Sequence, residues 1–150
     1  MLARGAGLIV TGLICLAAVP VQAAIKTETV QYKAGQADCV GFIAYDDATT
    51  TKRPGVLVVH EWWGLNDYAR NRAKALAAEG YIAFACDMYG RGATAEHPKE
   101  AGEMAAKVRA NVEEWQTRAR SALQVLSTHA LCDAENLAAI GYCFGGSTAL

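Results

Sequence analysis

A cysteine near the end of the printed sequence has the neighbours that a catalytic thiol needs. Cys143 lies at the centre of the run GYCFGG, residues 141–146, after an apolar stretch and before small residues that suit a helix. The pattern G-x-C-x-G is a cysteine version of the sharp strand-to-helix turn that exposes a nucleophile, and glycines such as Gly141 and Gly145 meet its steric demand. A thiol there can attack a carbonyl carbon and form a thioester that water hydrolyses. We therefore interpret Cys143 as a nucleophile, with a small buried residue as the alternative.

A second group of candidate residues directly follows a branched apolar run, and its letters are HEWWG. Glu61 could accept the thiol proton or hold it until substrate arrives, although a solvated loop carboxylate is the alternative. Alternation along the strand points His60 away from Glu61, so we interpret His60 as structural. We expect Trp62 and Trp63 to line a pocket wall. The backbone N–H of Trp62 and that of Phe144 are the candidate oxyanion hole.

The third candidate segment, with the letters DMYGRG, begins at Asp87. Arg91 lies between two glycines, where a guanidinium could face a substrate carboxylate; a surface arginine is the alternative. We expect Tyr89, Trp63 and Arg91 to contact the substrate. No pattern in the sequence predicts a metal site or an organic cofactor.

The positions of these three segments depend on the strands and helices that precede and follow them. Apolar patterning predicts an opening hairpin and then the order strand, helix, strand, helices, strand. The expected strands cover residues 26–32, 39–45, 56–59, 81–85 and 137–140; the expected helices begin after Asn66, at Pro98 and at Val112. This alternation is typical of an α/β fold, a mostly parallel sheet with helices on both faces. The carboxyl ends of parallel strands share one edge, so the three segments should converge there.

The helix expected over residues 112–129 has an apolar stripe and a charged face. We expect Glu114 and Arg118 to form a surface ion pair at i, i+4 spacing. The stripe that we expect to be buried consists of Val112, Trp115, Ala119, Ala122 and Leu126.

The cysteines that follow the first 25 residues number four and lack C-x-x-C spacing, which argues against zinc and thioredoxin-type sites. We expect Cys86 in the core. Cys39 and Cys132 are either packing residues or disulfide partners.

The first residues resemble an export signal. Arg4 is the only charge before residue 26, an apolar core covers residues 7–19, and small residues allow cleavage after Ala23. We therefore expect a signal peptide over residues 1–23, a domain over residues 24–150, and a periplasmic or secreted location. An uncleaved anchor is the alternative, but the core is shorter than the ~20 residues that span a bilayer. Without Arg4 the chain has 13 basic and 15 acidic residues, interspersed, so we expect no nucleic acid and no membrane contact after cleavage.

Together these segments resemble the dienelactone hydrolase family of α/β-hydrolases. The resemblance lies in residues 58–66 (VVHEWWGLN), 86–92 (CDMYGRG) and 141–146, in the family's order. It implies that Cys143 is the nucleophile, that Glu61 pairs with its thiol and that Arg91 binds a substrate carboxylate. It also implies cleavage of esters and lactones, notably carboxymethylenebutenolide, without a metal or organic cofactor.

The sequence departs from the family pattern after the cysteine. The family triad also needs an aspartate and a histidine later in the chain, but seven residues follow Cys143, and His60, His97 and His129 all precede it. We expect His97 and His129 to be surface residues. We therefore expect an N-terminal fragment that lacks about a hundred residues, has little activity alone and leaves its last strand as an unpaired edge. A non-catalytic binding protein with an α/β-hydrolase shell is the alternative function, and a thiol-redox protein is a weaker one because no resolving cysteine lies nearby.

Overall fold

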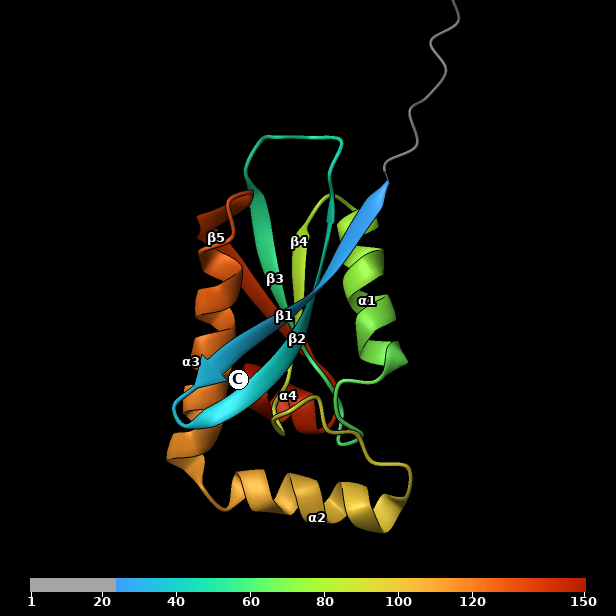
Figure 1. Ribbon diagram of the computed structural model, residues 1–150, viewed down its shortest axis with the longest axis vertical. Helices are drawn as coiled ribbons and strands as arrows, with labels where there is room; N and C mark the ends of the chain where they lie inside the picture. Colours follow the sequence, from blue (N-terminus) through green and yellow to red (C-terminus); the bar gives the residue numbers. More distant parts are fainter. Residues whose placement is uncertain (1–23) are drawn as a thin grey trace, which may run out of the picture.

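The computed structural model describes residues 24–150. The expected signal peptide, residues 1–23, lies outside this range. Within it, five strands form one sheet in the spatial order β1-β2-β4-β3-β5 (Figure 1). Their bounds are β1 Ile25–Ala34, β2 Ala37–Asp46, β3 Arg53–Val59, β4 Ile82–Cys86 and β5 Cys132–Gly141.

The sheet is antiparallel at one side and parallel at the other. β1 pairs with β2, and β2 with β4, in antiparallel fashion, whereas β3 runs parallel to both β4 and β5. The opening hairpin and the mostly parallel sheet of an α/β fold, both expected from the sequence, are therefore confirmed, and the antiparallel pairs are those of the hairpin strand β2. β5 has one partner, β3, and forms an edge of the sheet in the described part of the chain, as expected.

The helices cover both faces of the sheet and its carboxyl end. They are α1 Asp67–Ala78, α2 Pro98–Arg109, α3 Val112–Ser127 and α4 Phe144–Ala149. Figure 1 shows α1 and α3 on opposite sides of the sheet, with α2 and α4 at the end where β3, β4 and β5 finish. Each face has its own apolar cluster. Alanines of α1 pack on one face, and the other cluster includes Phe84, Leu126 and Phe144.

Asparagines cap the N-termini of α1 and α3. The Asn66 side chain accepts a hydrogen bond from Ala69 N at 3.3 Å, and the Asn111 side chain accepts one from Glu114 N at 3.1 Å. Each bond satisfies one of the backbone donors that a helix start leaves unpaired. Asn66 thus caps α1 as expected, and α1 is followed by Gly80, whose φ of 92° lies in the left-handed region.

The expected buried stripe of α3 is wrong at one end. Val112 is 57% exposed, whereas Arg118 is buried, with 8% of its surface accessible. Arg118 therefore does not form a surface pair with Glu114: the pair exists, but its guanidinium lies beneath the helix and also donates to a backbone carbonyl. Burial of the long side chain is tolerated because its charge is paired and hydrogen-bonded.

Two further expectations need correction. β5 begins at Cys132 rather than residue 137, because Cys132 and Asp133 already pair with Arg53 and Pro54 of β3; the register then shifts between Pro54 and Gly55 and skips residues 134–136. His129 is half-buried rather than a surface residue, and its ring lies 4.8 Å from that of Tyr45. His97 is exposed, as expected. Three described cysteines, Cys39, Cys86 and Cys132, are buried free thiols, so Cys86 is a core residue as expected.

Candidate active site

The turn between β5 and α4 holds Cys143 in a conformation that few residues with a side chain adopt. Its φ is 55° and its ψ is −116°, and the residue is exposed. A Cβ on Gly141 would lie 2.2 Å from Gly145 O, and a Cβ on Gly145 would lie 2.3 Å from Val59 O. Both clashes involve backbone atoms, so neither position admits a larger residue. The strained apex and the small neighbours that the sequence pattern predicts are both present.

The loop after β3 is held through a buried histidine. His60 Nε2 accepts a hydrogen bond from Met88 N at 3.1 Å, which leaves the ring proton on Nδ1, facing the Glu61 carbonyl oxygen. Burial lowers the pKa of His60, so the imidazole is neutral at physiological pH. His60 therefore ties the ends of β3 and β4 together, which agrees with its interpretation as a structural residue.

The loops after β3 and β4 are further joined by backbone contacts. Gly64 forms an isolated antiparallel bridge with Thr94, and Ala95 N donates to Trp63 O at 3.0 Å. A Cβ on Gly64 would lie 2.3 Å from Ala93 O, so the two loop segments approach each other too closely for any residue other than glycine at this position. Gly64 also has a φ of 86°, which glycine adopts readily.

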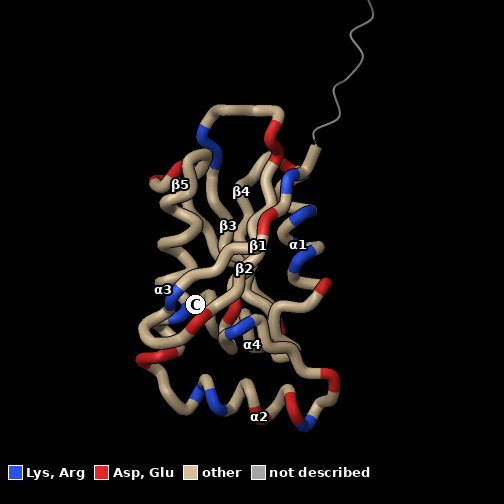
Figure 2. Tube along the Cα trace, in the orientation of Figure 1, with Lys and Arg blue, Asp and Glu red and all other residues tan. Residues whose placement is uncertain are grey.

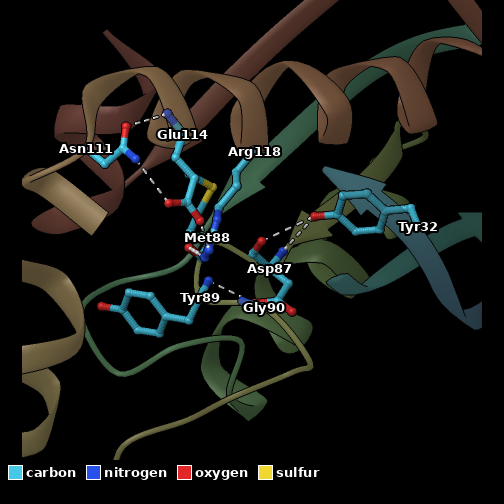
Figure 3. A network of polar contacts seen from close by, with 8 residues as sticks. All are labelled: Tyr32, Asp87, Met88, Tyr89, Gly90, Asn111, Glu114 and Arg118. Atoms are coloured by element: carbon cyan, nitrogen blue, oxygen red, sulfur yellow. Dashed lines mark hydrogen bonds and ion pairs between the residues drawn. The ribbon is translucent and has the colours of Figure 1, made fainter. Parts of the chain in front are cut away.

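Asp87 organises the loop after β4 (Figure 3). Its side chain is completely buried, and its two oxygens accept four backbone hydrogen bonds. The donors are Tyr89 N at 3.0 Å and Gly90 N at 2.7 Å to Oδ1, and Gly92 N at 2.7 Å and Val40 N at 3.0 Å to Oδ2. Asp87 begins the DMYGRG motif, but the sequence pattern alone gives it no role. An aspartate immediately before a glycine-rich turn is the signal that could have done so, because its oxygens can accept from backbone amides a few residues later.

Arg118 holds the same loop from α3. Its Nη1 donates to Met88 O at 2.6 Å, and its Nη2 pairs with Glu114, which Asn111 Nδ2 also approaches at 3.4 Å. Figure 3 shows these side chains on the α3 side of the loop and Tyr32 on the other. The Tyr32 hydroxyl accepts from Asp87 N at 3.1 Å. The loop is thus fixed from two elements that are remote in sequence.

Tyr89, which we expect to bind substrate, packs beside the turn that holds Cys143, and Trp63 packs on its neighbour Trp62. The Tyr89 hydroxyl donates to Trp62 O at 2.8 Å, and the Tyr89 ring lies 5.6 Å from the ring of Phe144, the residue after Cys143. Burial raises the pKa of Tyr89 to about 12, so the hydroxyl keeps its proton and remains a donor. Trp63 packs edge-on against Trp62 at 5.2 Å, and both indoles are half-buried.

Two other candidates, Glu61 and Arg91, form no hydrogen bond with the Cys143 thiol in the described residues. Glu61 is half-buried, and within residues 24–150 no hydrogen bond joins it to the Cys143 thiol. Arg91 is exposed with a φ of 56°, and its backbone N donates to Asp38 O at 2.7 Å, near the start of β2. Their catalytic and binding roles stay predictions.

The described residues offer no obvious place for a metal. No group of three or more histidine, cysteine, aspartate or glutamate side chains between residues 24 and 150 is arranged to hold an ion. None of the helices in this range combines the length and apolar character that crossing a bilayer requires.

A mixed, mostly parallel sheet with helices on both faces and a strained strand-to-helix turn defines an α/β-hydrolase. The model of the dienelactone hydrolase family matches residues 40–150, and the chain belongs to that family.

Relatives of known sequence and structure agree with this assignment. The chain is 30% identical over 101 residues to "Protein usf" of Aquifex pyrophilus, which covers 65% of this chain and 43% of that protein. It is also 31% identical to a protein of Aquifex aeolicus (strain VF5) named "Putative carboxymethylenebutenolidase". That match again extends over 101 residues and covers 65% of this chain and 43% of that protein.

Among solved structures, the protein called m3DLH superposes with a TM-score of 0.81 at 39% identity, covering 84% of this chain and 52% of that one. A dienelactone hydrolase-like promiscuous phosphotriesterase from metagenomic libraries superposes with a TM-score of 0.79 at 35% identity, with the same coverage. The chain thus spans about half the length of the proteins that it matches.

Proposed function

We propose that the protein carrying this sequence hydrolyses carboxylic esters or lactones through a thioester on Cys143. The observation that carries the proposal is the conformation of Cys143, whose exposed thiol lies at the strained apex of the turn. The turn has glycines at Gly141 and Gly145, and any larger residue at either position would clash with backbone atoms. Strain of this kind persists where the surroundings enforce it, and it clusters at active sites. The other three described cysteines are buried, so Cys143 is the thiol that a substrate can reach.

The reaction requires two steps. The Cys143 sulfur attacks the acyl carbon, a C–S bond forms, the C–O bond to the leaving alcohol breaks, and the alcohol oxygen takes a proton. Water then attacks the thioester, which restores the thiol and releases the acid. We assign Glu61 as the group that holds the thiol proton. Phe144 begins α4, so its N–H has no partner within the helix and is available, with the N–H of Trp62, to stabilise the oxyanion.

The general base is not among the histidines described. None of His60, His97 and His129 forms a hydrogen bond with the Cys143 thiol in residues 24–150, and His60 is committed to Met88. We infer that the aspartate and histidine of the family triad come from the half of the relatives' length that this chain does not span, and that residues 24–150 alone have little activity. Export, expected from residues 1–23, stays a prediction.

The metagenomic relative is a promiscuous phosphotriesterase, so phosphate triesters are a second substrate class worth assaying. The thiol would attack phosphorus in place of an acyl carbon: a P–S bond forms, the P–O bond to the leaving alcohol breaks, the alcohol oxygen takes a proton, and water then cleaves the P–S bond and restores the thiol. This activity would use the same nucleophile and oxyanion hole.

The test compares Cys143→Ala with Cys132→Ala, a buried cysteine that takes no part in the mechanism, in the longest natural form of the protein. With 4-nitrophenyl acetate, Cys143→Ala should lower kcat/KM by at least about a thousandfold, as removal of a nucleophile does in hydrolases, while circular dichroism is unchanged. Cys132→Ala should keep kcat/KM within a few-fold of the unsubstituted protein. Turnover that survives in Cys143→Ala would contradict the proposal. Binding of esters without any turnover in the unsubstituted protein would favour the non-catalytic alternative.

A further inference from the structure

A cation from α2 lies beside the nucleophile turn. The guanidinium carbon of Arg109, the last residue of α2, is 5.3 Å from the centroid of the Phe144 ring. Phe144 is completely buried and follows Cys143 directly. The same ring stacks on Trp115 at 5.6 Å and packs against Tyr89 at 5.6 Å, so Arg109 and Tyr89 share one aromatic neighbour next to the thiol.

The charge of Arg109 is not neutralised by a carboxylate. In the part of the chain that the structure describes, the ion pairs are Lys26–Glu28, Lys33–Asp38 and Arg118–Glu114, and the Arg109 guanidinium donates no hydrogen bond. Figure 2 shows basic residues gathered at the end of α2 that approaches α3. Basic residues at a helix C-terminus also offset the helix dipole, but that effect does not require a guanidinium to lie over Phe144.

Arg109 differs from Arg91 in what it faces. Arg91 is fastened through its backbone N to Asp38 O, near the start of β2; Lys33 and, to a smaller extent, Arg91 lower the pKa of the Asp38 carboxyl. Arg109 instead acts on Tyr89 at the site: its charge opposes the rise in the pKa of Tyr89, whereas Cys143 adds to it. Both groups are therefore within electrostatic reach of the same hydroxyl.

We propose that Arg109 is a second anion-recognition residue of this site, which binds a carboxylate on the substrate from the α2 side of Cys143. The inference rests on the proposed function for the identity of the reacting thiol. It adds a specificity residue that none of the three sequence motifs contains. A planar guanidinium suits the task because it can give a carboxylate two parallel hydrogen bonds.

The first test does not depend on hydrolysis. Iodoacetate and iodoacetamide alkylate a thiolate in the same way: a C–S bond forms, the C–I bond breaks and iodide leaves; the reagents differ in one negative charge. The ratio of their rates at Cys143, followed by mass spectrometry of the peptide that contains it, therefore reports the local positive charge. Arg109→Gln should lower the iodoacetate-to-iodoacetamide ratio by about threefold, as expected for loss of one partly solvated charge nearby.

Matched variants separate charge from packing. Arg109→Met removes the charge but can still cover the Phe144 ring, so it should lower the ratio as Arg109→Gln does. Lys99→Gln removes a charge from the far end of the same helix and should leave the ratio unchanged. An unchanged ratio in Arg109→Met, or an equal fall in Lys99→Gln, would overturn the proposal.

The second test uses paired esters of similar size. Arg109→Met should lower kcat/KM for anionic 4-nitrophenyl hydrogen succinate by about tenfold, the effect of losing one charged hydrogen bond, and change that for neutral 4-nitrophenyl butyrate by less than about twofold. Equal losses on both esters would contradict carboxylate binding. If the unsubstituted protein cleaves neither ester, the proposed function fails, while the alkylation ratio still decides whether Arg109 places its charge at Cys143.

Discussion

Two turns at the carboxyl end of the sheet, one after β4 and one after β5, are stabilised by different kinds of contact. The turn after β4, residues 87–92, is stabilised by side chains: the buried Asp87 carboxylate accepts four backbone hydrogen bonds, and Arg118 of α3 donates one to the Met88 carbonyl. The turn after β5, residues 141–146, is held by the contact of backbone with backbone. Removal of a polar group should therefore loosen the first turn, whereas addition of a single methyl group should disrupt the second.

The largest expected effect comes from Gly145→Ala. The new Cβ would lie 2.3 Å from Val59 O and 2.6 Å from His60 O, and backbone atoms of a buried strand cannot move aside cheaply. We expect a loss of more than about 3 kcal/mol in the free energy of unfolding, the range of severe overpacking. Urea unfolding monitored by tryptophan fluorescence measures it.

Gly102→Ala is the matched control for this methyl group. Gly102 lies within α2, and its Cβ would meet only the edge of Trp62 at 3.9 Å. Alanine should stabilise the helix here by about 0.5–1 kcal/mol. If both substitutions had similar effects, backbone contact would not be what holds the second turn.

Asp87→Asn should have the next largest effect. Asparagine keeps the shape of aspartate but replaces one oxygen with an NH₂ group, which would face two N–H donors that it cannot accept from. We expect a loss of about 2–3 kcal/mol in the free energy of unfolding. Asp46→Asn is the control, because Asp46 accepts a single exposed hydrogen bond from Ala48 N at 2.8 Å, and it should cost less than about 0.5 kcal/mol. Equal losses of unfolding free energy in the two variants would show that the buried Asp87 carboxylate does not stabilise the turn after β4.

The smallest effect concerns pH and the histidine that joins the two loops. Burial lowers the pKa of His60 in the folded state, so the unfolded chain binds the proton more readily. Stability should therefore be full above the unfolded pKa of about 6.5 and fall as the pH decreases toward 5, with a slope of at most about 1.4 kcal/mol per pH unit for one proton. His60→Asn should flatten this slope, and the exposed His97→Asn should not. His129, whose pKa burial also lowers, accounts for a remaining slope of the same sign. A slope that is unchanged in His60→Asn would contradict the assignment.

The sequence predicts those features of the fold that short-range chemistry controls. The hairpin, the buried run of β3, the Asn66 cap and the glycines of the turn between β5 and α4 can all be predicted because each depends on near neighbours in the chain. The start of β5 is not, because Asp133, Glu135 and Asn136 are polar and the pairing with β3 shifts register between Pro54 and Gly55.

The candidate site was less accessible to sequence analysis than the fold. The motifs located Cys143, Tyr89 and Trp62, which the structure brings to one edge. The burial of Arg118 and the position of Arg109 depend on how α2 and α3 dock, and helical spacing alone describes both as ordinary surface charges. Side chains that reach between elements remote in sequence leave no local signal.

The close approach of Gly64 to Ala93 has a consequence for attempts to redesign this protein. The segments that follow β3 and β4 are interlocked through Gly64, Trp63, Thr94 and Ala95, so neither can change length without displacing its neighbour. Loop exchange with a relative should succeed only when both segments are transplanted as a pair. The segments that follow β3 and β4 therefore behave as a single structural unit at the carboxyl end of the sheet.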